Sequence, residues 1–250
     1  MYQKIMKSQK KEIINDLVYF NDLKIVQNKD YFNFSLDSIL LPNFVKITPN
    51  TKKILDLCTG NAPIPLVLST MTKSKILGIE LQKEIYLLAK KSISINNLES
   101  QIEIINMDAK NVIDMYETDT FDLITCNPPY FKYNEGSIIN NNDIKTLARH
   151  EVTFKLDDLF KVSRKLLKNG GSVCLIHRTD RLIDIIESMK KNNIEPKRIR
   201  FVYPKIGSES NLVLIDGHKN GKSGLIILPP LYVHDKNGNY TNEVLKMFGK

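Results

Sequence analysis

The chain has 250 residues, of which 42% are hydrophobic, and its formal net charge is +8 at pH 7. No apolar stretch approaches the roughly 18 residues needed to cross a bilayer, and residues 1–16 are basic without the apolar core of a secretory signal. We therefore exclude a membrane-spanning protein and expect a cytoplasmic one, while the basic charge suggests a polyanionic partner such as nucleic acid.

Strand and helix patterns alternate along the chain from residue 52 onward. Strands are expected over 52–57, 74–81, 101–108 and 121–127, with helices after Pro63, over 82–97 and, as a short element, before residue 121. This alternation predicts an α/β fold, a Rossmann-like parallel sheet with helices on both faces.

The second half continues the alternation and then changes character. A helix is expected over 156–171, ended by Gly170 and Gly171, followed by a strand over 172–178 and a helix over 180–193. The stretches 197–204, 211–217 and 224–230 follow without a long helix between them, which predicts antiparallel strands completing the sheet. Residues 131–150 form a polar insert, and a loop of about 20 residues in a compact domain is usually functional or disordered.

Polar residues stand at the ends of four consecutive predicted strands. Asp56 and Gly60 lie in "ILDLCTGNAPIP", and Glu80 follows Gly60 by the spacing at which such folds offer a carboxylate to ribose hydroxyls. Asp108 and Asn127 end the next two strands. A cap at a strand end explains any one of these residues, whereas four together indicate one crevice at the carboxyl edge of the sheet.

Only one glycine remains of a three-glycine phosphate turn, because Cys58 and Ala62 occupy the flanking positions. A dinucleotide, which needs close pyrophosphate packing, therefore fits this turn less well than a nucleoside without phosphate. Cys58, Cys126 and Cys174 lie in or beside apolar runs without zinc-type spacing, so we interpret them as reduced packing residues and expect no metal.

The fourth strand closes with "NPPY", residues 127–130. Two prolines make one of the stiffest short stretches of chain, which suits either a plain strand stop or a site whose groups must be held still. The neighbouring motifs favour the site.

The motifs "DLCTGNAPIPL", "GIEL", "NMDA" and "NPPY", in this order, resemble those of class I S-adenosylmethionine-dependent methyltransferases that modify exocyclic or amide nitrogens. Within that class, "LKIVQNKDYFNFSLDSILLPNF", "LARHEV" and "PPLYVHDKNGNYTNE" resemble the bacterial tRNA1(Val) (adenine(37)-N6)-methyltransferase family. The resemblance covers nearly the whole chain. It implies a seven-stranded sheet, with residues 1–50 as an N-terminal arm and cofactor lid, residues 51–250 as the methyltransferase domain, and 131–150 as a substrate loop.

The resemblance also implies roles for individual residues. Asp56 and Gly60 would line the methionine side of S-adenosylmethionine, Glu80 would hold its ribose and Asp108 would bind its adenine. The full set of expected cofactor-binding residues is Phe34, Asp37, Asp56, Cys58, Gly60, Asn61, Glu80, Leu81, Asp108, Ala109 and Asn127. Ala62 departs from the family, which generally has glycine there, and its methyl group could narrow the cofactor turn.

The expected catalytic residues are Asn127, Pro128, Pro129 and Tyr130. An exocyclic adenine amine is a poor nucleophile because its lone pair is delocalised into the ring. The amide oxygen of Asn127 and the carbonyl of Pro128 could each accept one amine hydrogen, and Tyr130 could stack on an extruded base. No general base is needed, since the methylated amine becomes strongly acidic.

We expect tRNA as the partner of a monomeric enzyme, with RNA contacts from Lys10, Lys11, Phe131, Arg149, Arg198 and Arg200. Three alternatives stay open at this point: a glutamine-amide methyltransferase of a release factor, a DNA adenine methyltransferase and a catalytically silent RNA-binding module. The first usually has a longer helical N-terminal domain, and the second a larger target-recognition region.

Overall fold

A computed structural model describes residues 12–17, 23–29, 35–128 and 154–249. In this part of the chain the main sheet has nine strands in the order β10-β8-β9-β7-β6-β3-β4-β5, with β11 also paired to β8. The bounds of the strands are β1 (Glu12–Asp16), β2 (Lys24–Asn28), β3 (Lys53–Leu57), β4 (Lys75–Glu80), β5 (Ile102–Asn106), β6 (Phe121–Cys126), β7 (Leu167–Arg178), β8 (Ile194–Lys205), β9 (Leu212–Lys219), β10 (Ile226–Ile227) and β11 (Leu231–His234).

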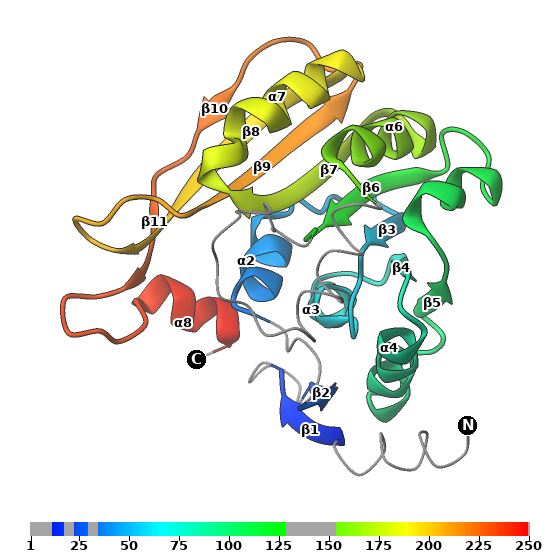
Figure 1. Cartoon of the computed structure of the whole chain (residues 1–250), viewed down its shortest axis with the longest axis horizontal. Helices are drawn as coiled ribbons and strands as arrows, with labels where there is room; N and C mark the ends of the chain where they lie inside the picture. Colours follow the sequence, from blue (N-terminus) through cyan, green and yellow to red (C-terminus); the bar gives the residue numbers. More distant parts are fainter. Residues whose placement is uncertain (1–11, 18–22, 30–34, 129–153, 250) are drawn as a thin grey trace, which may run out of the picture.

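Helices cover both faces of this sheet (Figure 1). One face carries α2, α3, α4 and α8, and the other carries η2, α6 and α7, with a separate hydrophobic cluster under each layer. The bounds are α2 (Asp37–Phe44), α3 (Pro63–Met71), α4 (Lys83–Ile95), the 3-10 helix η2 (Ala109–Asp114), α6 (Leu156–Leu166), the 3-10 turn η3 (Thr179–Arg181), α7 (Leu182–Lys191) and α8 (Asn242–Phe248). The predicted α/β sheet with two helical layers is confirmed.

The strand pairing confirms the seven predicted strands that become β3 to β9 and most of the directions, and the short strands β10 and β11 raise the count in the main sheet to nine. Strands β5, β4, β3, β6 and β7 run parallel, β9 runs antiparallel to both β7 and β8, and β10 and β11 are short additions to β8. The prediction was wrong for residues 224–230, because the two-residue strand β10 pairs with β8 in the parallel direction. The strand order reverses between β3 and β6, which opens a crevice at their carboxyl ends.

The predicted end of the fourth helix was also wrong. Helix α6 ends at Leu166, and Gly170 and Gly171 lie inside β7. A Cβ atom on Gly171 would lie 3.1 Å from the carbonyl oxygen of Asp122, and the register of β6 on β7 shifts at this place. Gly171 therefore allows a close approach of two strands at an irregularity, and Gly170 adopts a left-handed φ of 76°, where we expected a helix stop.

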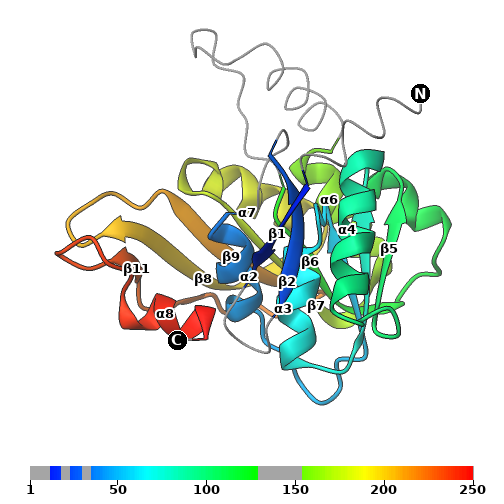
Figure 2. The same ribbon diagram turned by 90° about the horizontal axis from the view of Figure 1, so that it is seen from below.

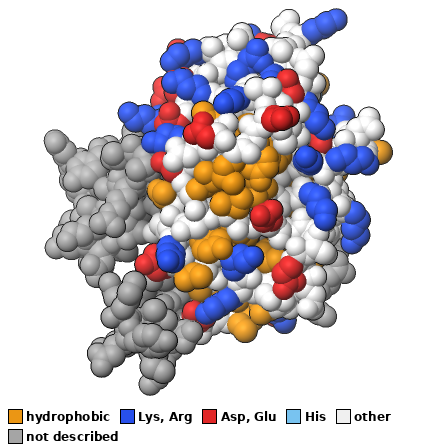
Figure 3. All heavy atoms as spheres, turned by 90° about the vertical axis from the view of Figure 1, so that its right-hand side faces the viewer, with side chains coloured by type: hydrophobic (Ala, Val, Ile, Leu, Met, Phe, Trp, Pro, Cys, Tyr) orange, Lys and Arg blue, Asp and Glu red, His pale blue; other side chains and the backbone are white. Residues whose placement is uncertain are grey.

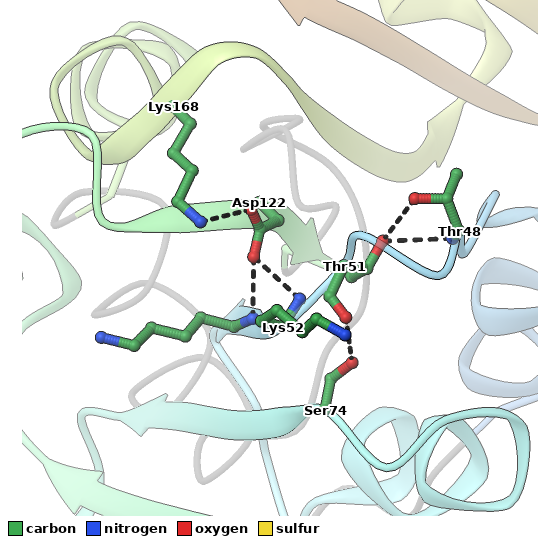
Figure 4. Close-up of polar contacts among 7 residues, drawn as sticks. Thr48, Thr51, Lys52, Ser74, Asp122 and Lys168 are labelled. Atoms are coloured by element: carbon green, nitrogen blue, oxygen red, sulfur yellow. Dashed lines mark hydrogen bonds and ion pairs between the residues drawn. The ribbon is translucent and has the colours of Figure 1, made fainter.

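The opposite, amino-terminal edge of the sheet is tied together by Asp122 (Figure 4). Its carboxylate accepts hydrogen bonds from the backbone N–H groups of Lys52 and Lys53 at 2.8 and 2.9 Å, and Lys168 Nζ lies 2.6 Å away. Partial burial alone would raise the pKa of Asp122, but these donors lower it. Asp122 thus joins the starts of β3, β6 and β7, far from the crevice.

The β1–β2 hairpin lies against α4 (Figure 2). Val26 N–H donates to Ser92 Oγ at 3.0 Å. The side-chain amide of Asn96 accepts from Lys24 N–H and donates to the Lys24 carbonyl oxygen. Leu17, Leu23 and Ile25 belong to the same hydrophobic cluster as α2 and α3. The described part of the first 50 residues is therefore packed against the main sheet's helices.

No helix among the described residues is both long and apolar enough to cross a membrane.

The side of the molecule that carries α4 and the edge strand β5 shows an apolar patch surrounded by charged side chains (Figure 3). Leu87 and Ile95 of α4 are among the exposed apolar residues on these elements.

Candidate active site

Four polar residues meet at the carboxyl edge of the sheet, as predicted. Asp56 lies in β3, Glu80 ends β4, Asp108 follows β5 by two residues and Asn127 directly follows β6. Because β3 to β6 are neighbours in a parallel sheet, these positions share one edge.

A small pocket lies at this edge. It is lined by Cys58, Ile79, Glu80, Leu81, Met107, Asp108, Ala109 and Phe154. Five of these eight residues are among the expected cofactor-binding residues. The pocket, here named the cofactor pocket, measures only about 20 Å³, so an adenosine enters only if wall side chains move.

The turn after β3 has an unusual backbone. Cys58, Gly60 and Ala62 all adopt left-handed conformations, with φ of 58°, 60° and 71°. A Cβ on Gly60 would meet no heavy atom within 4 Å, whereas the Ala62 methyl group belongs to the hydrophobic core beneath the turn. Ala62 therefore fills core space, and its cost is backbone strain of about 1 kcal/mol or more.

Glu80 fixes this turn from the neighbouring strand. Its Oε2 accepts from Gly60 N–H at 3.0 Å and its Oε1 accepts from Gln82 N–H at 2.7 Å. Burial raises the pKa of Glu80, while these backbone donors lower it in part. Each carboxylate oxygen can accept a second hydrogen bond, so Glu80 can hold the turn and still accept from ligand hydroxyls.

Asp56 lies beneath the turn, fully buried. Its two oxygens accept from the hydroxyls of Thr59 and Thr125, each at 2.6 Å. Burial, the largest effect, and the nearby Glu80 raise the pKa of Asp56 to about 7, against the two hydroxyl donors. The geometry favours a role in positioning the turn, and direct contact with a cofactor stays a prediction for Asp56. Sequence reasoning missed both threonines.

Asp108 caps η2 by accepting from Lys110 N–H at 2.9 Å. Lys110 Nζ lies 3.5 Å from the other carboxylate oxygen. This arrangement places an acceptor beside the apolar side chains of Leu81 and Ala109 in the cofactor pocket.

Asn127 reaches toward the opposite helical layer. Its Nδ2 lies 3.5 Å from the Oγ of Ser38, a buried residue of α2 next to Asp37. The contact links the end of β6 to α2. Ser38 was missed in the sequence, although it lies in the motif "FSLDS" that carried the resemblance.

Asn61 lies outside the lining of the cofactor pocket. Its Nδ2 donates to the carbonyl oxygen of Val26 at 2.9 Å and so joins the turn to β2 of the hairpin. The contact explains why an asparagine follows Gly60: it links the turn to the N-terminal segment.

The two described arginines expected to bind RNA are engaged in internal contacts. Arg198 pairs with buried Asp216, donates to the carbonyl of Phe44 at 3.1 Å and lies 4.6 Å from the centre of the Phe44 ring. Arg200 pairs with Glu243 at 2.7 Å and donates to the Pro229 carbonyl at 3.0 Å. These contacts favour structural roles. Seven further expected residues lie outside the described part of the chain: Lys10, Lys11, Phe34, Pro129, Tyr130, Phe131 and Arg149.

The described residues include no group of three or more His, Cys, Asp or Glu side chains that could hold a metal ion.

The family model described as "Methyltransferase small domain" matches residues 35–192. The chain belongs to this methyltransferase family. The match begins just before α2 and ends just after α7, so it includes Ser38, the cofactor pocket and the NPPY motif.

Curated relatives carry a more specific name. A protein of Cytophaga hutchinsonii named tRNA1(Val) (adenine(37)-N6)-methyltransferase is 26% identical over 192 residues, which cover 76% of this chain and 78% of that protein. A protein of the same name from Haemophilus influenzae is 26% identical over 230 residues, covering 91% of this chain and 94% of the relative.

Solved structures agree on the fold. A predicted O-methyltransferase from Agrobacterium tumefaciens has a TM-score of 0.68 at 18% identity, covering 85% of this chain and 95% of its own. TrmN from Thermus thermophilus has a TM-score of 0.54 at 19% identity, covering 73% of this chain and 48% of its own. At such identities the likeness shows the methyltransferase fold alone.

Proposed function

We propose that the chain transfers a methyl group from S-adenosylmethionine to the exocyclic N6 amine of an adenine in tRNA, next to the anticodon of valine tRNA. The observation that supports this proposal is that Asn127 and Pro128 follow β6 at the same edge of the sheet as the cofactor pocket. The names of the curated relatives support the choice of substrate.

The residues of the cofactor pocket suit a nucleoside. Glu80 and Asp108 supply carboxylate acceptors for ribose hydroxyls and an adenine amine, and Ile79, Leu81 and Met107 supply apolar walls for a ring. S-adenosylmethionine, when bound, supplies an electrophilic methyl group. Glu80 also fixes Gly60, so ribose recognition and the shape of the turn depend on one carboxylate.

Asn127 and Pro128 would prepare the nucleophile. Oδ1 of Asn127 accepts one hydrogen of the target amine and the carbonyl of Pro128 accepts the other, which favours a pyramidal nitrogen whose lone pair is directed at the methyl group. The contact with Ser38 would help to fix the orientation of the Asn127 amide. Stacking by Tyr130, RNA contacts by Lys10, Lys11, Phe131 and Arg149, and a lid formed by residues 1–50 complete the proposal, for a monomer acting in the cytoplasm.

The test is to offer labelled S-adenosylmethionine to the purified chain with total tRNA, duplex DNA and a release factor in parallel. We expect label in tRNA alone, because the basic chain and its relatives both indicate that polymer. Label confined to the release factor or to DNA would overturn the substrate, and no label in any of the three would overturn the activity.

A further inference from the structure

A cleft of about 530 Å³ opens beside the candidate active site. Its lining residues come mainly from α6 and α7, the two helices that cover one face of the sheet in Figure 1. It extends from Pro128 and His177, near the ends of β6 and β7, along α7 as far as Lys191. Phe154 lines both this cleft, here named the α6–α7 cleft, and the cofactor pocket. The cleft therefore adjoins the place of methyl transfer, and its volume suits a ligand of nucleotide size, since such pockets measure roughly 300–1,000 Å³.

The charges that line the cleft balance. The cations are Lys155, Arg181 and Lys191, and the acids are Asp157, Asp184 and Glu187. Arg181 Nε lies 2.6 Å from Asp184, and Lys191 Nζ lies 3.2 Å from Asp157. A phosphate site needs an excess of positive charge, and this lining has none, although the chain as a whole is basic.

Histidine adds no charge at neutral pH. Burial, helped by the neighbouring Arg181, lowers the pKa of His177 to about 4. Its Nδ1 accepts a hydrogen bond from Arg178 N–H at 2.8 Å. The neutral imidazole thus forms an uncharged wall of the cleft.

The remaining walls suit the faces and edges of a nucleobase. Pro128, Phe154 and Leu156 present apolar surface. Within the described part of the chain, the Oγ of Ser188 is buried without a hydrogen-bond partner, and the exposed lining residue Glu187 forms no ion pair. A base edge that bonds Ser188 would remove the cost of an unsatisfied buried hydroxyl, and single-stranded RNA is recognised by stacking combined with such edge contacts.

We propose that the α6–α7 cleft binds the base of a tRNA nucleotide adjacent to the methylated adenine. This proposal rests on the proposed function. The target amine must reach Asn127, which contacts α2 on one face of the sheet, whereas the cleft extends from Pro128 along α7 on the other face. An adenine held by Asn127 and the Pro128 carbonyl leaves the part of the cleft along α7 unfilled, so this part takes the neighbouring base.

The test measures kcat/KM for three anticodon stem-loop RNAs: an unaltered one, and two that lack the base on either the 5′ or the 3′ side of the target adenine. With the native chain, loss of one of these bases should lower kcat/KM about tenfold or more, the size of a lost stacking contact. Ser188→Phe, which fills the cleft, should lower kcat/KM on the unaltered RNA by a similar factor, and the same missing base should then have no further effect.

Ile183→Phe is the matched control, because Ile183 is an exposed residue of α7 outside the lining of the cleft. It should behave as the native chain, and both variants should bind S-adenosylmethionine with native affinity. If Ser188→Phe lowers the melting temperature, Glu187→Ala is measured in its place, because Glu187 is exposed and its substitution should not disturb the fold. The same missing base should then have a smaller effect in Glu187→Ala than in the native chain.

The base-binding role of the cleft would be contradicted if Ser188→Phe and Glu187→Ala kept the native kcat/KM. It would also be contradicted if the effect of each variant and the effect of the missing base multiplied independently. Neither result would affect the proposal of RNA methylation. Methylation of a release factor without methylation of RNA would overturn the proposed function, and the RNA site with it.

Discussion

At the scale of single residues, Asp56 illustrates what a sequence motif leaves open. The motif marks an acid at a strand end, and the resemblance assigns it to the cofactor. In the structure it is fully buried and bonded to Thr59 and Thr125, one from the turn and one from β6. Thr59 is three residues from Asp56 in the same motif, but the contact with Thr125 could not be read from spacing, because Thr125 is 69 residues away in the chain.

The burial of Asp56 predicts a dependence of stability on pH. Its pKa is about 7 in the folded chain, against about 3.9 in an unfolded one, so the folded state binds the proton more tightly. This contribution is fully present below pH 4 and is lost as the pH rises through 7. Between pH 4.5 and pH 8 we expect the free energy of unfolding to fall by about 2–4 kcal/mol more in the native chain than in Asp56→Asn.

Denaturant unfolding at several pH values measures this difference. Asp114→Asn is the control, because Asp114 is exposed on η2, and its profile should run parallel to the native one. Parallel profiles for the native chain and Asp56→Asn would contradict the buried, proton-binding carboxyl group.

Arg198 shows that amino-acid composition cannot reveal what an arginine binds. Six arginines among 36 basic residues suggested positions that need a planar guanidinium group, and Arg198 is such a position. The guanidinium group is used inside the protein, because it donates to Asp216 and lies over the ring of Phe44. A strand pattern cannot reveal whether an arginine faces a buried acid or a ligand.

At the scale of elements, the alternation of strand and helix patterns predicted β3 to β9 and the helices between them. This was possible because the spacing of apolar residues follows directly from the backbone geometry of a strand or a helix. The end of α6 was predicted wrongly because glycine serves two purposes. It ends helices, and it also allows strands to approach closely, as Gly171 does beside Asp122. The α6–α7 cleft was not predicted, since it depends on how two helices separated by β7 lie together.

Asp122 holds together the first residues of β3, β6 and β7, so its substitution should lower the stability of the fold. Asp122→Ala removes the acceptor for two backbone N–H groups and Lys168, so we expect a loss of about 1–3 kcal/mol in the free energy of unfolding. Lys168→Met removes only a half-exposed ion pair and should cost less than about 1 kcal/mol. Equal losses in the two variants, measured by denaturant unfolding, would show that the backbone contacts contribute nothing.

At the scale of the whole molecule, the main sheet gathers residues from four strand ends into one edge, and the family match spans that edge. The order of motifs was sufficient to predict this crevice, because parallel strands fix the edge at which their carboxyl ends emerge. The sequence could not show that Ser38 of α2 would reach Asn127 across the crevice. The chain segments that join the sheet to RNA remain predictions for Lys10, Lys11, Phe131 and Arg149.

The most direct test of the account is nucleoside mass spectrometry of unmodified valine tRNA after incubation with S-adenosylmethionine and either the native chain or Asn127→Ala. We expect N6-methyladenosine next to the anticodon with the native chain. With Asn127→Ala we expect formation to be about a hundredfold slower or more, with little change in cofactor affinity by calorimetry, since about 3 kcal/mol of transition-state stabilisation is lost. No N6-methyladenosine with the native chain, or an equal rate with Asn127→Ala, would contradict the account.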